Sequence, residues 1–374
     1  MKTPRPGLVL AVFCLAWPLA ADASRLSEIA ARLAPGRWAT LNNSSDASGF
    51  KPALLCAELK QGEHLCGDNI LNYAGEGQWD PSRHELHFIG AGHLRETKHI
   101  AYDEAANRWK LEPNPPWNCK GQPGCTQYAS LGHNFDAVTM NPATGDIDVR
   151  LPGYAGAPLY RWRRDSGEWQ PLLPAPATAY TMALEYFPEM GGLVLVGGGH
   201  VYLLRDGATE WSTLAEGLPM GSYSSVASYN PAKHAIVFGG GDSDQGYTSR
   251  DFYRLDAEGK VTRLASAPEP FGIQLSQLVY DPGSQRELLM TRSGKVYDYD
   301  LADDAWRPVA TSLPTNPKRP VQWTAVVAVP TYGVVLLLAQ HDFDDYRVHI
   351  YRHQASIAKP LPAAAAPAAS AASR

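Results

Sequence analysis

The sequence predicts an all-β protein folded as a six-bladed β-propeller. Six times along the chain an apolar strand runs into an X-Pro corner, and a second apolar strand follows at once. The corners are Asp80-Pro81, Asn141-Pro142, Phe187-Pro188, Asn230-Pro231, Asp281-Pro282 and Val329-Pro330. Their prolines are 61, 46, 43, 51 and 48 residues apart. Repeats of about 40–50 residues with four short strands each are typical of propellers, in which each unit buries its faces only against its neighbours.

The composition fits one closed domain of this kind. The chain has 374 residues, of which 44% are hydrophobic, and this is enough to bury a large core. The formal net charge is −5, with acidic and basic residues mixed along the chain. We therefore expect no nucleic-acid partner, because phosphate binding needs a basic surface. After the N-terminal segment no apolar run reaches the length of a transmembrane helix, so we expect no membrane span.

Residues 1–23 have the pattern of a secretory signal peptide. Lys2 and Arg5 precede an apolar run from Leu8 to Leu19, and small residues follow at Ala21-Asp22-Ala23. This pattern predicts a secreted or periplasmic protein.

The propeller domain is expected to span residues 24–358. The sixth unit ends before a fourth strand appears, and residues 36–41, which include Trp38, supply the missing strand. We expect this N-terminal strand to complete the last blade and close the ring, which leaves no unpaired sheet edge. Apolar residues from Leu26 to Leu33 are at helical spacing and predict one short helix. The Ala/Pro-rich residues 359–374 are expected to be a disordered tail.

Four cysteines follow the signal peptide, in two close pairs. Cys56 and Cys66 lie close together in the sequence, and so do Cys119 and Cys125. In an oxidising compartment we expect two local disulfides, although three connectivities are formally possible. Neither pair is a CxxC, so the pairs are interpreted as loop staples.

Glycines and tryptophans recur at fixed places in the repeated units. Glycine runs follow the second strands at Gly90-Ala91-Gly92, Gly197-Gly198-Gly199 and Gly239-Gly240-Gly241. Tryptophans stand in the expected fourth strands at Trp109, Trp169, Trp211 and Trp306. A large indole at this position provides an apolar contact between adjacent blades. Together these residues resemble the kelch repeats of secreted bacterial, galactose-oxidase-like propellers.

Two sets of polar residues are expected to meet at one rim of the propeller. The first strand of a blade begins at the rim where the second strand ends. Counting eight residues back from each corner proline gives Tyr73, Asn134, Tyr180, Tyr223, Gln274 and Gln322. Counting forward to the ends of the second strands gives His93, Tyr154, His200, Asp242 with Ser243, Arg292, and His341 with Asp342. Such a ring suits a hydroxyl-rich carbohydrate, since amide and phenol groups bond hydroxyls and aromatic rings stack on sugars.

A plainer interpretation exists for each part of this ring. The inner strands of any propeller surround a wet channel, so polar residues there can bind water alone. A histidine after a glycine run can simply cap a turn.

The stretch from Asn72 to Pro81, together with Gly90 to His93, resembles the opening unit of propeller polysaccharide lyases. Those enzymes act on uronate-containing glycans by β-elimination. The resemblance implies that His93 and His133 form an acid/base pair and that Tyr154 is a second proton carrier. It also implies that Arg150 or Arg292 neutralises the uronate carboxylate.

Two other functions remain open from the sequence. The first is a non-catalytic propeller that binds a glycan or a protein partner, and the second is a periplasmic sugar-acid epimerase. A zinc site built from His93, His99 and His133 lacks HxH or HExxH spacing, so we expect no metal. Copper-radical chemistry needs a tyrosine–cysteine partnership, whereas the cysteines are assigned to disulfides. We therefore expect no cofactor.

Overall fold

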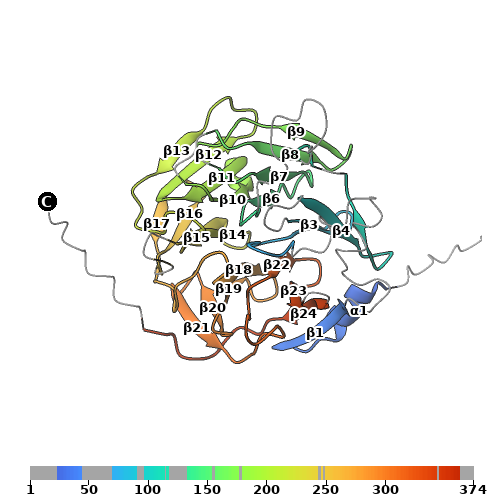
Figure 1. The fold of residues 1–374 in the computed structure, drawn as a ribbon. Coiled ribbons are helices and arrows are strands. Elements are labelled where there is room, and N and C mark those ends of the chain that lie inside the picture. The colour runs from blue at the N-terminus through green and yellow to red at the C-terminus, as the bar shows by residue number, and fades with distance from the viewer. Residues whose placement is uncertain are drawn as a thin grey trace, which may run out of the picture.

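The protein is a six-bladed β-propeller, as the sequence predicts. The computed structural model describes residues 23–43, 70–90, 97–113, 115–117, 133–153, 156–176, 179–242, 246, 249–342 and 345–362. Within these ranges the chain forms six four-stranded antiparallel sheets arranged around a common centre (Figure 1). The innermost strands of neighbouring blades contact one another around the whole ring.

Each blade is a meander of consecutive strands, except the last. Blade 1 contains β2 (Gln78–Asp80), β3 (Glu85–Gly90), β4 (Lys98–Asp103) and β5 (Arg108–Leu111). Blade 2 contains β6 (Val138–Met140), β7 (Ile147–Arg150), β8 (Leu159–Arg163) and β9 (Glu168–Pro171). Blade 3 contains β10 (Ala183–Phe187), β11 (Gly192–Gly197), β12 (His200–Arg205) and β13 (Ser212–Ala215), with the 3₁₀ turn η2 (Pro188–Met190) at its corner.

The remaining blades follow the same order. Blade 4 contains β14 (Val226–Asn230), β15 (Ala235–Gly239), β16 (Phe252–Asp256) and β17 (Val261–Arg263). Blade 5 contains β18 (Ser276–Asp281), β19 (Arg286–Thr291), β20 (Val296–Asp300) and β21 (Ala305–Val309). Blade 6 contains β22 (Thr324–Val329), β23 (Val334–Asp342), β24 (Asp345–Arg352) and β1 (Arg37–Asn43).

The proline corners set one register in all six blades. The residue two before each corner proline pairs with the residue five after it, as in Trp79 with Leu86 and Tyr280 with Glu287. The residue three after each proline has a positive φ angle: His84, Gly145, Gly191, His234, Gln285 and Gly333. Equivalent residues of different blades therefore occupy equivalent places, and the distance from the proline measures depth along the axis.

The N-terminal strand closes the ring. β1 pairs antiparallel with β24, so that Trp38 lies opposite Tyr351 and Ala39 opposite Ile350. The rings of Trp38 and Tyr351 stack with centroids 4.4 Å apart. The predicted closure by residues 36–41 is thus confirmed, and the strand extends two residues further.

The predicted short helix is also present. α1 (Arg25–Arg32) begins after Ser24, whose hydroxyl accepts a 3.0 Å hydrogen bond from the amide of Ser27. Leu26 and Ala30 are buried in the cluster of side chains shared by blades 1 and 6. Arg352 of β24 donates to the Ala30 carbonyl oxygen at 2.6 Å and holds the helix on blade 6.

Tryptophans fasten neighbouring blades in a repeated way. In four blades an indole N–H donates to a group on the segment after the outermost strand of the preceding blade. The pairs are Trp169 with the Pro113 carbonyl (3.4 Å), Trp211 with Pro174 (3.1 Å), Trp306 with Ala265 (3.0 Å) and Trp38 with the Thr311 hydroxyl (3.1 Å). The indole thus adds a hydrogen bond to its apolar contact.

Several expectations lie outside the described residues. These are the signal peptide up to residue 22, all four cysteines of the mature chain, and the tail from residue 363. In the described part of the chain no helix has the length and apolar character needed to cross a membrane.

The closing strand gives a test of the fold. Leu41 of β1 is fully buried in the cluster between blades 1 and 6. We expect Leu41→Ala to lower the free energy of unfolding by about 3 kcal/mol, because the truncation leaves a cavity. Urea unfolding measures this loss. Leu173→Ala is the matched control at a more exposed site, and a loss at Leu41 no larger than the control would contradict the buried closure.

Candidate functional site

The axis of the propeller is closed near its middle by contacts that skip a blade. The Ala227 amide of blade 4 donates to the Asp136 carboxylate of blade 2 at 2.7 Å. The Gln277 side chain of blade 5 donates to the Ala74 carbonyl of blade 1 at 3.1 Å. These bonds separate two regions of the axis. We name the end at which the innermost strands begin the start face, and the end at which they meet the proline corners the corner face.

The closure depends on a glycine. A Cβ at residue 75 would overlap the carboxylate of Asp136, so no other residue fits under that side chain. Burial raises the pKa of Asp136 to about 7, although the hydrogen bond from the Ala227 amide opposes the shift. The contact between Asp136 and Ala227 thus places a carboxyl group with a pKa near neutrality inside the molecule.

The start face brings the two predicted sets of residues together in blade 4. Tyr223 and Asp242 form an antiparallel bridge, in which the Asp242 amide donates to the Tyr223 carbonyl at 2.7 Å. In blade 5 the Arg292 amide donates to the carbonyl of Leu275, the neighbour of Gln274, at 2.7 Å. Starts of first strands and ends of second strands therefore share one rim, as the count from the prolines predicts.

The chain turns sharply as it enters the innermost strands. Non-glycine residues with positive φ stand there in five of the six blades: Tyr73, Phe135, Ser224, Gln274 and Trp323. Such conformations are costly for residues with a side chain and cluster at sites where function constrains the backbone.

Aromatic side chains crowd this end of the axis. The rings of Tyr73 and His133 lie 4.2 Å apart, and Phe135 packs edge-on against both. Tyr180 of the next blade lies edge-on to Phe135 at 6.5 Å. Tyr180 and Tyr223 are 41% and 37% exposed, which is unusual for large rings in this molecule. The start face therefore offers phenol rings to solvent above a packed aromatic floor.

The other predicted ring residues are less prominent. Asn134 is buried, and its amide nitrogen has no partner among the described residues. Gln274 donates to the Asn72 side chain at 3.3 Å across the axis, and Gln322 is half-buried. Arg292 is exposed.

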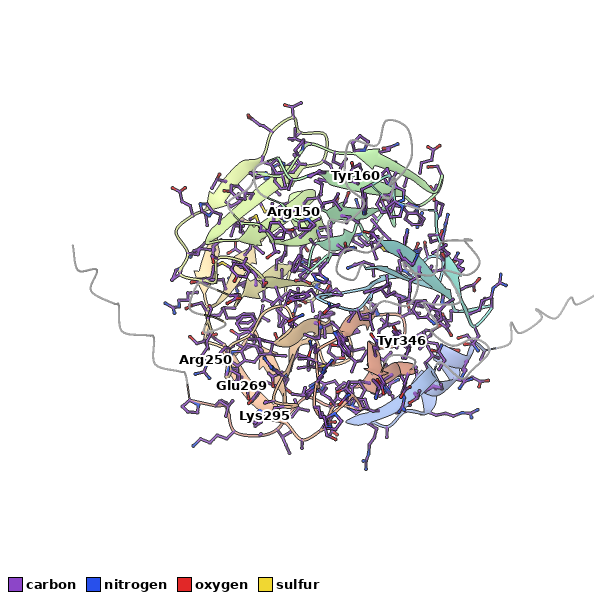
Figure 2. The ribbon with its side chains drawn as sticks, in the orientation of Figure 1. Arg150, Tyr160, Arg250, Glu269, Lys295 and Tyr346 are labelled. Atoms are coloured by element: carbon purple, nitrogen blue, oxygen red, sulfur yellow. The ribbon has the colours of Figure 1, made fainter. Side chains whose placement is uncertain are left out.

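Arg150, expected to hold a carboxylate, is instead placed inside blade 2 (Figure 2). Its side chain is 1% exposed and donates to the carbonyls of Gly153, Ala179 and Tyr180, the shortest bond being 2.7 Å to Gly153. These contacts brace the loop that carries Tyr180 and give the guanidinium a structural role.

Two further predicted histidines, His200 and His341, make contacts within their own blades. His200 makes a 2.8 Å contact with the Gly198 carbonyl and stacks on Tyr202, so it caps its turn. His341 lies 3.3 Å from His349 of β24, nitrogen to nitrogen. Burial, and then repulsion from His341, lowers the pKa of His349 to about 4. His93, Tyr154 and Ser243 lie outside the described residues.

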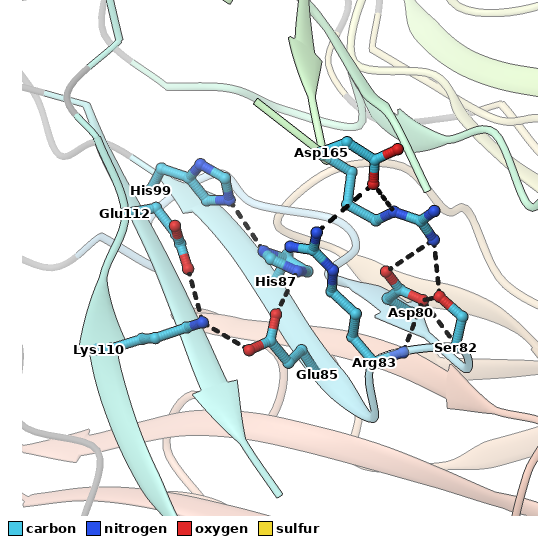
Figure 3. A network of polar contacts seen from close by, with 10 residues as sticks. Asp80, Ser82, Arg83, Glu85, His87, His99, Lys110, Glu112 and Asp165 are labelled. Carbon is cyan, nitrogen blue, oxygen red and sulfur yellow. Dashed lines mark hydrogen bonds and ion pairs between the residues drawn. The ribbon is translucent and has the colours of Figure 1, made fainter. Parts of the chain in front are cut away.

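A chain of polar side chains runs across blade 1 toward blade 2 (Figure 3). Nδ1 of His87 and Nε2 of His99 are 3.1 Å apart, and the His99 ring meets the edge of Trp162 in β8. Lys110 binds Glu85 at 2.5 Å, and contacts with His87 and Lys110 lower the pKa of Glu85 to about 2. Burial lowers the pKa of His99 well below its usual range, so its imidazole is neutral. Within the described ranges no group of three or more His, Cys, Asp or Glu residues could hold a metal ion, and His93 of the zinc set weighed above lies outside those ranges.

A cavity on the corner face escaped the sequence reasoning. It has a volume of about 330 Å³ and receives one residue from each blade, two positions before the corner proline: Trp79, Met140, Tyr186, Tyr229, Tyr280 and Ala328. We name this cavity the axial well and these residues its collar. The collar can be found in the sequence by counting two residues back from each corner proline. The signal is that four of the six residues at this position are aromatic.

The deeper wall of the axial well is acidic. Glu76 and Glu185 line it, together with Gln78, Thr139 and Ser228. The pKa of Glu76 is raised well above its ordinary value by burial first and then by repulsion from Glu185 and Asp136. Burial and the charge of Asp136 raise the pKa of Glu185 in the same direction.

A larger cavity of about 710 Å³ is lined by residues of blades 4 and 5 and of the segments that follow them. Figure 2 labels two of its lining residues, Arg250 and Lys295, near the outer edge of the ring. Trp306 also lines the cavity. Lys295 is bound to Glu269 at 3.0 Å, and Glu269 also accepts from Tyr297 at 2.8 Å. Lys295 of this lining thus has a carboxylate partner, whereas no cation lines the axial well among the described residues.

No family model matches the sequence, and no curated protein matches it. Among solved structures, the crystal structure of a nidogen/laminin complex is similar over 63% of this chain and 79% of that chain, with 9% identity and a TM-score of 0.45. A protein of unknown function from Bacteroides thetaiotaomicron is similar over 75% and 70%, with 9% identity and a TM-score of 0.48. Neither likeness bears on what this chain binds.

The buried Asp136 predicts a pH-dependent difference in stability. Its pKa is about 7 in the folded protein, whereas an unfolded aspartate titrates near ~4. The folded state therefore binds the proton more tightly, and this contribution to stability is lost as the pH rises from about 4 to about 7. Asp136→Asn cannot titrate, so its stability relative to the natural protein should rise by roughly 2–3 kcal/mol between pH 5 and pH 8.

Urea unfolding of both proteins at the two pH values measures this change. Asp165→Asn, which removes an exposed carboxylate, is the control. A difference between natural protein and Asp136→Asn that stays constant with pH would rule out the raised pKa.

Proposed function

We propose that this protein is a secreted, kelch-type propeller that binds a carbohydrate at its start face. The observation that carries the proposal is the pair of exposed tyrosines, Tyr180 and Tyr223, beside the packed rings of Tyr73, His133 and Phe135. Aromatic faces stack on pyranose rings, and phenol and amide groups exchange hydrogen bonds with sugar hydroxyls.

The braced backbone supports this choice. Arg150 fixes the carbonyls of Ala179 and Tyr180, and Tyr223 is held by its bridge to Asp242. Rings that are held in place before binding lose little conformational entropy when a ligand arrives. The exposed Arg292 at the same rim favours a glycan that carries carboxylates, such as one containing uronate.

Lyase activity is the more specific form of the proposal. It would require His93 and Tyr154 to act with His133 on a uronate, and the described residues contain only the last of these. His133 is buried against Tyr73, so its ring contributes to the floor of the site. Binding is therefore the function that the described geometry supports best.

Loss of the exposed rings should weaken glycan binding. We expect Tyr180→Ala and Tyr223→Ala each to weaken binding of a uronate polysaccharide by roughly 2–10-fold, the value of one aromatic contact. Tyr180→Phe and Tyr223→Phe keep the rings and should bind within about 2-fold of the natural protein. Isothermal titration against a panel of neutral and uronate polysaccharides makes the comparison.

The same panel separates binding from catalysis. Growth of ultraviolet absorbance from a new unsaturated bond would establish the lyase, and binding without this signal would establish a binding module. If no glycan in the panel binds, or if the alanine variants bind as well as the natural protein, the start face is not a carbohydrate site.

A further inference from the structure

The axial well combines an aromatic collar with an acidic wall. Trp79, Tyr186, Tyr229 and Tyr280 stand around it near the corner face, and Glu76 and Glu185 line it as well. Among the described residues that line the well there is no lysine, arginine or histidine. Burial and mutual repulsion, with no cation in the lining, raise the pKa of both glutamates.

Glu76 is not explained by the fold. Its carboxylate lines the well and receives no hydrogen bond from the described residues. The same depth in the other blades, five residues before the proline, holds Ala137, Ala183, Val226, Gln277 and Ala325. The innermost strand at this depth therefore needs only a small or uncharged side chain, and the carboxylate of Glu76 is an addition to it.

Glu76 is half-buried and Glu185 is buried, and a third carboxylate nearby adds to the negative potential. Glu287 of β19 is fully buried, and its Oε2 has no partner among the described residues. It accepts a hydrogen bond from Asn230 at 2.8 Å through Oε1, and it interacts electrostatically with both Glu76 and Glu185. Burying carboxylates without a counter-charge is costly, and a bound cation would offset that cost.

We propose that the axial well binds a ligand that carries a protonated amine or a guanidinium. The carboxylates of Glu76 and Glu185 would accept the N–H groups, and the aromatic rings of the collar would face the cationic head and its alkyl stem. A uronate does not suit this site, because the wall would repel it. The well is thus distinct from the start face in both position and charge.

The size of the well limits the ligand. A volume of about 330 Å³ is at the lower end of ligand pockets and admits a small alkylamine or the side chain of one basic residue. A free amine and a lysine side chain of a partner present the same chemistry. They differ in the group attached to the far end of the alkyl stem, because a peptide must also lie across the corner face.

The first test titrates the natural protein with n-butylammonium and with n-butanol, which has nearly the same shape without the charge. We expect the ammonium to bind and the alcohol to bind much more weakly. Glu76→Gln should weaken ammonium binding by roughly 10–100-fold, the value of a charge-assisted hydrogen bond. Glu168→Gln, which removes an exposed carboxylate from β9, should leave it unchanged.

The folding of the variant is checked separately. Glu76→Gln removes a carboxylate that is repelled by its neighbours, so its melting temperature should equal or exceed that of the natural protein. Tyr280→Leu provides a second variant, in which loss of one collar ring should weaken ammonium binding without changing the charge.

The source of the cation is tested with a short acetylated peptide containing one lysine. Tighter binding of the peptide than of n-butylammonium would identify a protein partner, and weaker binding would identify a small amine. Absence of ammonium binding, equal binding of ammonium and alcohol, or equal weakening by Glu76→Gln and Glu168→Gln would each overturn the proposal. The test does not depend on the carbohydrate assay, because the two sites lie at opposite ends of the axis.

Discussion

The structure depends on how closely the innermost strands approach at the axis. The Asp136 carboxylate reaches from blade 2 to the Ala227 amide of blade 4, and it can do so only because residue 75 has no side chain. Gln277 makes a comparable bond between blades 5 and 1. Contacts that skip a blade fix the whole ring and not only adjacent pairs. They cross the axis between the start face and the corner face.

The division lets one fold carry two kinds of chemistry. The start face has the exposed rings of Tyr180 and Tyr223 over a packed aromatic floor, and the exposed Arg292 lies on its rim. The axial well has aromatic rings in front of Glu76 and Glu185, whose pKa values are raised by burial and by repulsion between neighbouring carboxylates.

The fold and the position of each residue along the axis could both be predicted from the sequence. The proline corners give the blade number, the register and, by counting, the ring of residues at the start face, because a strand advances by a fixed distance per residue. Ring closure by the strand around Trp38 follows from the missing fourth strand of the last unit. The glycine runs and the tryptophans also indicate the blades. Each of these signals lies within a short stretch of sequence.

The sequence could not predict how side chains pair between blades. The resemblance to propeller lyases implies a carboxylate-binding role for Arg150, but its side chain is buried against three carbonyls, at Gly153, Ala179 and Tyr180. The partnership of His99 with His87 likewise depends on which face of a strand meets Trp162 of the next blade. Such contacts are set by the twist and spacing of whole sheets. No single stretch of sequence contains that information.

Equivalent positions of the six blades can be compared to separate residues that the fold requires from residues that it does not require. At the collar position Met140 and Ala328 occupy places that elsewhere hold tyrosine or tryptophan, so the fold accepts any apolar side chain there. Three positions before the corner proline, Val279 of blade 5 stands where blade 3 has Glu185. The carboxylates and phenols of the axial well are therefore not required to build a blade. Burial and mutual repulsion favour the neutral form of Glu76 and Glu185, and a positively charged ligand would hold them ionised, which gives a function to carboxylates that blades 1 and 3 do not need for folding.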